Sequence, residues 1–496
     1  MMLPDVVLLE IFDFYLDSGD EDSLYMYYDP NVEDKLTAWY TLVRVCRTWR
    51  NIVLGSPLRL NLRIYCVPHR TQARKTIVAW PALPIIVMDD CDAIRDKEKW
   101  VNNIVAVFEH SDRICLLNLD NIRSQQLEIV LVAMQQSFPV LTRIALHSKD
   151  GETAPVVPAS FLGGSAPQLQ FLILERIPFP GLPKLLLSAT HLVCLYLWGI
   201  PHSGYISPEM MVTCLSVLTR LEKLSIQFKS PQSLPDRNSR RPPPPTRTLL
   251  PVLTRLLFKG VSEYLEDLMA RIDAPLLNDL WIAFFHQLIL DTPQLTQFIS
   301  RTPNFKTPDE VHEVHLEFSS GIARVAIRSR FIKLSFGISC RPSDWQVSFL
   351  TQMCNLPFLQ DLNPVVEHLY IQHIPYSDSE PPRPDDIEGS QWLELLRPFT
   401  AVNDLYISKK CELLITPALQ ELVGERATEA LPALRTLFLR EKLSSGPVQE
   451  AIEQFVTARQ LSSHPIAVSY WDGGSEDSDL DEYEEEDGSS YEIDDD

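Results

Sequence analysis

The stretch LQFLILERIPFPGLPKLLLSATHLVCLYL, residues 169–197, decides the fold of this chain. It begins and ends with the same hexamer, L-x-x-L-x-L, as LQFLIL at 169–174 and LVCLYL at 192–197. Successive side chains of a strand point to opposite faces, so positions four and six of each hexamer point inward together. Each hexamer therefore predicts a short strand with one buried face.

The hexamer recurs twelve times along the chain, with Ile, Val or Phe sometimes replacing Leu. The copies start 20 to 36 residues apart, in or somewhat above the range of leucine-rich repeats. One copy is weak evidence, but twelve in series indicate a repeat array. They are ICLLNL (114–119), LTRIAL (141–146), LQFLIL (169–174), LVCLYL (192–197), LEKLSI (221–226), LTRLLF (253–258), LNDLWI (277–282), VHEVHL (311–316), FIKLSF (331–336), VEHLYI (366–371), VNDLYI (402–407) and LRTLFL (434–439).

Helical patterns lie between the hexamers. In VSEYLEDLMARI, residues 261–272, four apolar side chains share one helix face: Leu265, Leu268, Met269 and Ile272. Alternating strands and helices predict an α/β fold with a parallel sheet. One such unit cannot bury its apolar face alone, so we expect neighbouring units to stack into a curved solenoid. The units resemble the irregular leucine-rich repeats of F-box proteins, without the usual Asn after the last Leu.

The N-terminal residues 3–66 follow a different sequence pattern from the hexamer repeats. LPDVVLLEIFDFYL at 3–16 predicts one amphipathic helix, and AWYTLVRVCRTWRNIV at 38–53 predicts a second helix or helix pair. The Leu-Pro start, the Ile-Phe pair and the later Val-Cys-Arg-x-Trp segment resemble an F-box. The resemblance implies a Skp-type adaptor surface formed or supported by Leu3, Pro4, Leu9, Ile11, Phe12, Val45 and Trp49. The whole chain is similar to the large fungal F-box family.

Four segments follow from these patterns. Residues 1–66 are the F-box-like module, 67–113 a connecting or capping segment, and 114–471 the repeat region. Proline-rich loop insertions interrupt that region at 231–251 and 375–390. Residues 472–496 carry fourteen acidic side chains and no Lys or Arg, so we expect a disordered acidic tail.

The charge of the chain lies largely in that tail. The whole chain has a net charge of −22, whereas residues 1–471 hold 44 basic and 52 acidic side chains, a net of −8. A mildly acidic body argues against binding nucleic acid through phosphate neutralisation. No run of about 18 apolar residues is present, and the N-terminus lacks a basic segment, so neither a membrane span nor a signal peptide is expected.

The nine cysteines form no CxxC pair, and no N-x-S/T sequon is present. Both observations fit a reducing compartment, cytoplasmic or nuclear. The sequence also lacks the phosphate-binding and nucleophile-elbow motifs of common enzymes. In VHEVHLEF at 311–318, Glu313, His315 and Glu317 alternate along a strand, which is not the helical H-E-x-x-H zinc pattern. We therefore expect no catalytic residue, metal or cofactor.

Three functions remain open. The F-box resemblance implies the substrate-recognition subunit of a cullin–RING ubiquitin ligase, in which the module binds the adaptor and the repeats hold a target protein. The alternative is a protein-binding scaffold whose F-box-like segment only caps the repeats. An enzyme with an unrecognised site is the third.

Positions three and five of each hexamer, along with the residue just after it, point away from positions four and six, so they predict the target-binding face. Aromatic side chains are frequent there, and Trp, Tyr and Arg often dominate binding energy. The aromatic and histidine candidates are Phe171, Tyr196, Trp198, Trp281, His315, Tyr370, Tyr406 and Phe438; the others are Ile173, Lys223, Arg255, Lys259, Glu313, His368 and Arg440.

Overall fold

The structure is a computed structural model of the chain. It describes residues 3–16, 37–70, 73–80, 82–91, 94, 96–231, 246–285, 292–306, 313–319, 321–340, 343–360, 365–373, 388–440 and 446–471. The predicted acidic tail at 472–496 and most of the two predicted insertions lie outside these residues.

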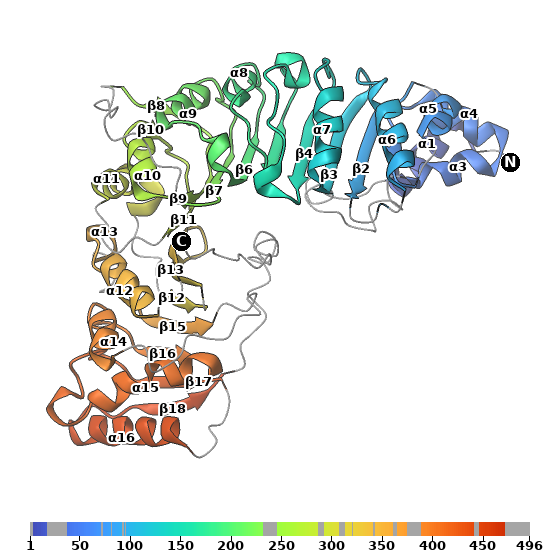
Figure 1. Cartoon of the computed structure of the whole chain (residues 1–496). Coiled ribbons are helices and arrows are strands. Elements are labelled where there is room, and N and C mark those ends of the chain that lie inside the picture. Colours follow the sequence, from blue (N-terminus) through green and yellow to red (C-terminus); the bar gives the residue numbers. More distant parts are fainter. Residues whose placement is uncertain are drawn as a thin grey trace. The chain divides into compact units, whose positions relative to one another are not determined.

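The described chain divides into two compact units (Figure 1). Unit 1 comprises residues 1–233 with 248–253, and unit 2 comprises 234–247 with 254–496. In unit 1 the helices are α1 (Asp5–Leu16), α3 (Trp39–Val45), α4 (Arg47–Gly55), α5 (Ala73–Ala79), α6 (Lys97–Phe108), α7 (Ser124–Ala133), α8 (Leu182–Leu186) and α9 (Pro208–Leu215). Its strands are β1 (Ile64–Cys66), β2 (Ile85–Asp90), β3 (Ile114–Ile122), β4 (Arg143–Ser148), β5 (Phe171–Glu175), β6 (Cys194–Ile200), β7 (Lys223–Phe228) and β8 (Thr248–Leu249).

Unit 2 repeats the mixture of helices and strands. Its helices are α10 (Ser262–Met269), α11 (Pro293–Arg301), α12 (Ser343–Cys354), α13 (Pro357–Gln360), α14 (Gly389–Leu396), α15 (Glu412–Glu421) and α16 (Pro447–Leu461). Its strands are β9 (Arg255–Gly260), β10 (Ile272–Asp273), β11 (Asp279–Phe285), β12 (Glu313–Phe318), β13 (Ile322–Arg328), β14 (Lys333–Ser339), β15 (His368–His373), β16 (Asp404–Ile407), β17 (Thr436–Leu439) and β18 (Ala467–Tyr470).

The hexamers are strands, as predicted, and they pair position for position. In unit 1 the strands lie side by side in chain order from β1 to β7, and each is parallel to its neighbours. Arg143, Phe171, Cys194 and Lys223, each at position three of its hexamer, align in one row across β4 to β7. The prediction of an α/β fold with a mostly parallel sheet is confirmed.

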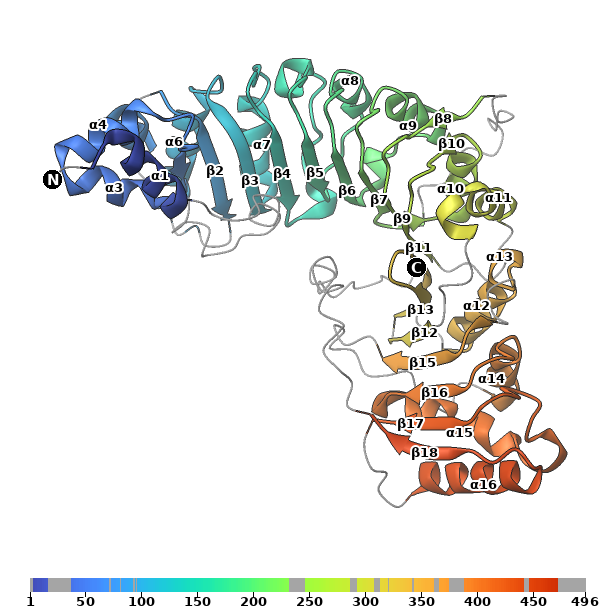
Figure 2. The same ribbon diagram turned by 180° about the vertical axis from the view of Figure 1, so that it is seen from behind.

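The helices of each unit gather on one face of its sheet (Figures 1 and 2), and successive helices pack against each other. Positions four and six of the hexamers fill the layer between sheet and helices. In β5 these are Leu172 and Leu174, and in β16 they are Leu405 and Ile407, all fully buried. A fully buried Leu or Ile side chain contributes about 1.5–3 kcal/mol to folding, so this layer is the core of each unit.

Two local sequence signals start helices in unit 1. The Asp96 carboxylate accepts a hydrogen bond from the Lys99 backbone N–H at 3.0 Å and caps α6. Before α9, the Ser207 hydroxyl accepts one from the Met210 backbone N–H at 3.3 Å, and Pro208 occupies the first helical position.

The prediction of a curved solenoid built of parallel strands was wrong in two respects. The sheet of neither unit is curled into a solenoid. In unit 2 the strand order is β9-β11-β14-β13-β12-β15-β16-β17-β18, and β13 is antiparallel to both β12 and β14. Only residues 319–321 and 329–332 connect these strands, which is too short for the crossover of about a dozen residues that parallel neighbours need. Strand β13 corresponds to no hexamer and was not expected from the sequence.

The segment 67–113 is more than a connection, because β2, α5 and α6 lie in it. The sheet of unit 1 therefore begins at β1, before the first hexamer. Near this end, the Trp39 indole N–H donates a hydrogen bond to the Arg63 carbonyl at 2.9 Å. The Trp39 ring also packs edge-on against Trp80, with centroids 4.9 Å apart, and so joins α3 to the sheet end.

A buried arginine holds the last helix of unit 2. Arg459 of α16 is fully buried, and its guanidinium donates hydrogen bonds to the carbonyls of Ala427, Leu431, Pro432 and Leu434 at 2.9 to 3.4 Å. Burial lowers the pKa of Arg459. The planar guanidinium of arginine has five N–H donors in a fixed arrangement, which suits four converging carbonyls. The ammonium group of a lysine has only three donors and could not bind all four.

We expect Arg459→Met to destabilise unit 2 by about 3 kcal/mol or more, because four buried carbonyls lose a charged donor. Hydrogen exchange of the amides at 424–434 and the denaturation midpoint measure the loss. Arg426→Met is the matched control, since Arg426 is an exposed arginine paired with Glu429 and Glu421. Equal effects of the two substitutions would contradict this role of Arg459.

Candidate functional site

Helix α1 exposes an apolar surface. We call the exposed side chains Leu3, Val6, Val7, Ile11, Phe14, Tyr15 and Val45 the module surface. Phe14 is 86% exposed, Val6 64% and Ile11 47%. Five of the seven lie on α1, Leu3 lies just before it and Val45 ends α3. Several large apolar side chains exposed on one element commonly mark an interaction site.

The predicted adaptor residues divide between this surface and its support. Leu3, Pro4, Ile11 and Val45 are exposed, and Leu9 and Trp49 are half-buried. Phe12 is fully buried and packs edge-on against Trp49 of α4, with ring centroids 4.8 Å apart. Phe12 is therefore a core residue that supports the surface rather than forming it.

The second candidate surface is the sheet face opposite the helices, which we call the open face. In every hexamer positions four and six are buried toward the helices, and positions three and five project to the open face. In unit 1 the open face is largely apolar and close-packed: Ala145, Ile173, Cys194 and Tyr196 form one cluster.

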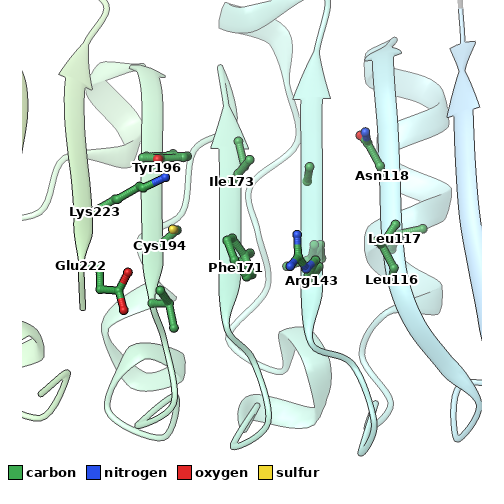
Figure 3. A pocket seen from close by; sticks show the side chains of 13 residues that line it. Leu116, Leu117, Asn118, Arg143, Phe171, Ile173, Cys194, Tyr196, Glu222 and Lys223 are labelled. Atoms are coloured by element: carbon green, nitrogen blue, oxygen red, sulfur yellow. The ribbon is translucent and has the colours of Figure 1, made fainter. Parts of the chain in front are cut away.

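A small hollow of about 80 Å³ interrupts the open face of unit 1 (Figure 3). Its size suits one inserted side chain, because pockets for small-molecule ligands measure about 300–1,000 Å³. The lining residues come from neighbouring strands β3 to β7 and the residues just before them: Leu116, Leu117, Asn118, Arg143, Ile144, Ala145, Phe171, Ile173, Val193, Cys194, Tyr196, Glu222 and Lys223.

Three predicted aromatic target-binding residues lie at or next to this hollow, and the predicted Ile173 and Lys223 also line it. Phe171 and Tyr196 line it, and Trp198 stacks on Tyr196 with centroids 5.3 Å apart. The Trp198 indole N–H donates a hydrogen bond to the Ser225 hydroxyl at 2.9 Å, which fixes the ring. The guanidinium of Arg143 lies 3.9 Å from the centroid of the Phe171 ring, a cation–π contact.

Four other predicted residues form a continuous aromatic stack on the open face of unit 2. The ring centroids of His315 and Tyr370 are 4.4 Å apart, those of Tyr370 and Tyr406 are 4.3 Å apart, and those of Tyr406 and Phe438 are 4.4 Å apart. The rings are nearly parallel, with interplanar angles of 5° to 12°. They stack because all four occupy position five in neighbouring parallel strands, which lie about 4.8 Å apart.

Trp471, directly after β18, lies against this aromatic stack. Its ring meets Tyr406 edge-on at 5.4 Å and Tyr370 at 6.0 Å between centroids. Burial raises the pKa of Tyr370 and of Tyr406, and the nearby carboxylates of Glu313 and Asp404 act in the same direction. Both phenols therefore stay neutral hydrogen-bonding groups at physiological pH.

The predicted residue Trp281 stands apart from the aromatic stack. It lies on the open face of β11, and the strands β14 and β13 separate it from His315 on β12. The structure therefore places seven of the eight predicted aromatic and histidine residues in two groups, one in each unit, with Trp281 in neither.

Glu317 anchors the antiparallel strands beside the aromatic stack. Arg324 pairs with one of its carboxylate oxygens, and the other accepts a hydrogen bond from Arg328 Nη2 at 3.0 Å. Burial by itself raises the pKa of Glu317, but the two guanidinium groups outweigh it and hold the pKa below the ordinary glutamate value. Glu317 is thus committed to an ion-pair network.

Neither a metal centre nor a membrane span is found in the part of the chain that the structure describes. Among those residues, no three His, Cys, Asp or Glu side chains converge as metal ligands, and no helix has the length and apolar content to cross a membrane. All nine cysteines are free thiols.

Nine lining residues of the hollow were not among the predicted contacts, and three of them are polar or charged: Asn118, Arg143 and Glu222. Asn118 stands at position five and Arg143 at position three of their hexamers, so the position rule finds both when it is applied without regard to residue type. Glu222 stands at position two, for which the pattern gives no orientation.

The comparisons with known proteins add no relative: no protein-family model matches the chain, and no curated protein matches its sequence.

We expect Glu317→Gln to lower the stability of unit 2 at neutral pH, because two arginines lose their carboxylate. Because the pKa of Glu317 is lower in the folded chain than in the unfolded chain, its ion pairs stabilise the fold at pH values above the ordinary glutamate pKa of about 4.3. This stabilisation is lost as the pH falls through the pKa of the folded state. The gap in denaturation midpoint between native and variant chains should therefore narrow from pH 7 to pH 3.

Glu453→Gln, at an exposed position of α16, is the control and should show little change at pH 7. A gap for Glu317→Gln that stays constant across this pH range would contradict the assignment.

Proposed function

We propose that this chain is the non-catalytic substrate-recognition subunit of a cullin–RING ubiquitin ligase of the Skp-adaptor type. The module surface binds the adaptor, which connects to the cullin, and the open face binds a target protein. The chain then acts in the cytoplasm or nucleus by holding its target near the ubiquitin-loaded enzyme, so that the rate gain comes from proximity.

The observation that carries the proposal is the exposure of the module surface. Seven large apolar side chains among the described residues 3–16 and 37–45 face solvent, although Phe12 and Trp49 give the same helices a packed interior. Burying side chains of this size against a partner is favourable at roughly 25 cal/mol per Å². The resemblance of this segment to an F-box implies that the partner is a Skp-type adaptor.

The target half of the proposal is supported by the residue types of the open face. Aromatic side chains at its hollow and in its aromatic stack are the kinds that contribute most to binding at protein interfaces. The hollow is sized for a side chain, which favours a protein partner over a small molecule.

One observation favours the alternative, a protein-binding scaffold without a ligase role. The contacts of Trp39 with Arg63 and Trp80 let the N-terminal helices cover the β1 end of the sheet, which a repeat array needs in any case. Capping alone, however, does not require α1 to expose Val6, Ile11 and Phe14.

The adaptor test uses point variants, because deletion of residues 1–66 would also remove strand β1. The double variant Ile11→Asp, Val45→Asp places charges on two exposed side chains, 47% and 55% exposed. We expect co-purification with a Skp-type adaptor to fall at least tenfold, with the melting temperature within about 2 °C of the native chain, since exposed substitutions cost little stability.

Val78→Asp is the matched control. Val78 is 81% exposed on α5, outside the F-box-like module, so adaptor binding should be unchanged. Full adaptor binding by the Ile11, Val45 double variant would count against the ligase proposal. A native chain that binds no adaptor but captures protein targets would establish the scaffold instead.

A further inference from the structure

The last strand of unit 2, β18, has a neighbour on one side only. It is parallel to β17, and no further strand lies beyond it in the part of the chain that the structure describes (Figure 1). The Ala467 N–H donates to the Arg435 carbonyl at 2.8 Å, and the Trp471 N–H donates to the Leu439 carbonyl at 3.0 Å. Backbone groups alternate in direction along a strand, so those of residues 468 and 470 point away from β17. Outward N–H and C=O groups of this kind are a template for pairing with another strand.

The side chains of β18 continue the pattern of a buried strand. Val468 and Tyr470 align with Leu437 and Leu439, which are positions four and six of the last hexamer. Those leucines are fully buried, whereas Val468 is 39% exposed and Tyr470 is 53% exposed. Helix α16 ends with Leu461, which is 82% exposed. The end of unit 2 therefore exposes apolar side chains at the positions that the hexamers bury, next to an open strand edge.

The sequence of β18 does not protect this edge. Natural sheet edges are commonly blunted by charged side chains, by proline within the strand or by a covering helix or loop. Residues 466–470, IAVSY, contain neither a charged residue nor a proline. The β1 end of unit 1 differs, because Trp39 attaches the N-terminal helices there. A second copy of the chain would therefore bring its own β18 as the matching free edge.

Two copies of β18 fit each other in the antiparallel direction. When Ser469 of one copy faces the partner's Ser469, each Val468 faces the partner's Tyr470. Each of the two Val–Tyr pairs exchanges two backbone hydrogen bonds through its outward N–H and C=O groups. Pairs of an aromatic and a β-branched side chain stabilise antiparallel strands, and the small Ser469 allows close approach at the two-fold axis.

Charge favours the antiparallel arrangement over a parallel one. Residues 472–496, which follow Trp471 directly, carry fourteen acidic side chains and no Lys or Arg. Parallel strands would start the two acidic segments side by side, whereas antiparallel strands place the two Trp471 residues at opposite ends of the pair. A closed two-fold pair also leaves no free edge at β18, whereas parallel addition would expose a new one.

We propose that β18 is a dimerisation edge, at which two copies of this chain join antiparallel about a two-fold axis at Ser469. The partner strand covers the apolar end of unit 2, as the terminal unit of a repeat array requires. Strands this short make a small interface, so we expect a dissociation constant of about 10 µM. The inference goes beyond the proposed function and does not rest on it, because neither the module surface nor the open-face hollow takes part.

The first test is sedimentation velocity of the full chain at concentrations from about 1 to 200 µM, over which the dimer fraction should rise. Val468→Pro removes an outward N–H but none of the bonds to β17, and proline is tolerated at an edge with that orientation. We expect it to weaken dimerisation at least tenfold. Val468→Thr is the matched control: it keeps the N–H and the β-branched shape, so its dissociation constant should stay within about threefold of the native value.

The second test locates the two-fold axis by cross-linking. Facing residues of a non-hydrogen-bonded antiparallel pair have Cα atoms about 4.5 Å apart, a separation that a disulfide spans. Under mild oxidation Ser469→Cys should therefore form a covalent dimer. Ala467→Cys is the matched control, because residue 467 shares the open face but lies opposite the partner's Trp471. The native chain gives the background from its own thiols, of which Cys46 is exposed.

Three results would overturn the inference: a native chain that is monomeric at 200 µM, a Val468→Pro chain that dimerises as well as the native one, or equal cross-linking of the two cysteine variants. Slow hydrogen exchange of the Val468 and Tyr470 amides in the monomer would also overturn it, because another segment of the chain would then occupy the edge. Should Val468→Pro lower the melting temperature, Tyr470→Glu takes its place, since it leaves the backbone unchanged and sets a carboxylate against the partner's Val468.

Discussion

The in-register pairing of the hexamer strands is the constraint on which the rest of the structure depends. Positions four and six are apolar in all twelve hexamers, so burying them against the helices fixes which face every strand presents. A slip of one residue would expose this set and bury charged side chains such as Arg143 and Lys223 instead. Because neighbouring strands align at the same position, side chains at positions three and five form rows across the open face.

The rows of side chains at positions three and five give the two units different open faces, although the hexamer pattern is the same in both. In unit 1 the row of Asn118, Ala145, Ile173 and Tyr196 mixes sizes, so its smallest member leaves a hollow. In unit 2 the corresponding row places His315, Tyr370, Tyr406 and Phe438 next to each other, and flat rings of similar size stack without a gap. The difference arises from residue volume at one position of the hexamer.

The N-terminal helices are attached to the sheet end and also expose apolar side chains to solvent. Trp39 joins them to the sheet end, Phe12 and Trp49 fill their interior, and the outer side of α1 exposes Val6, Ile11 and Phe14. A segment needed only to cap the sheet would gain solubility from polar residues at Val6, Ile11 and Phe14. Their exposure is the reason to look for a partner at this end of the chain.

The sequence by itself determined the twelve hexamer strands and their buried faces, and the helix at Ser262–Met269, because apolar periodicity depends only on local geometry. It also indicated the apolar α1 face and most aromatic residues of the open face. Only the tertiary structure decided which strands are neighbours. The short turns at 319–321 and 329–332 fold β13 and β14 back, so His315 of β12, rather than Ser335 of β14, stacks on Tyr370. The sequence could not predict that Asn118 Oδ1 lacks a hydrogen-bond partner, because such partners depend on contacts between residues far apart in the chain.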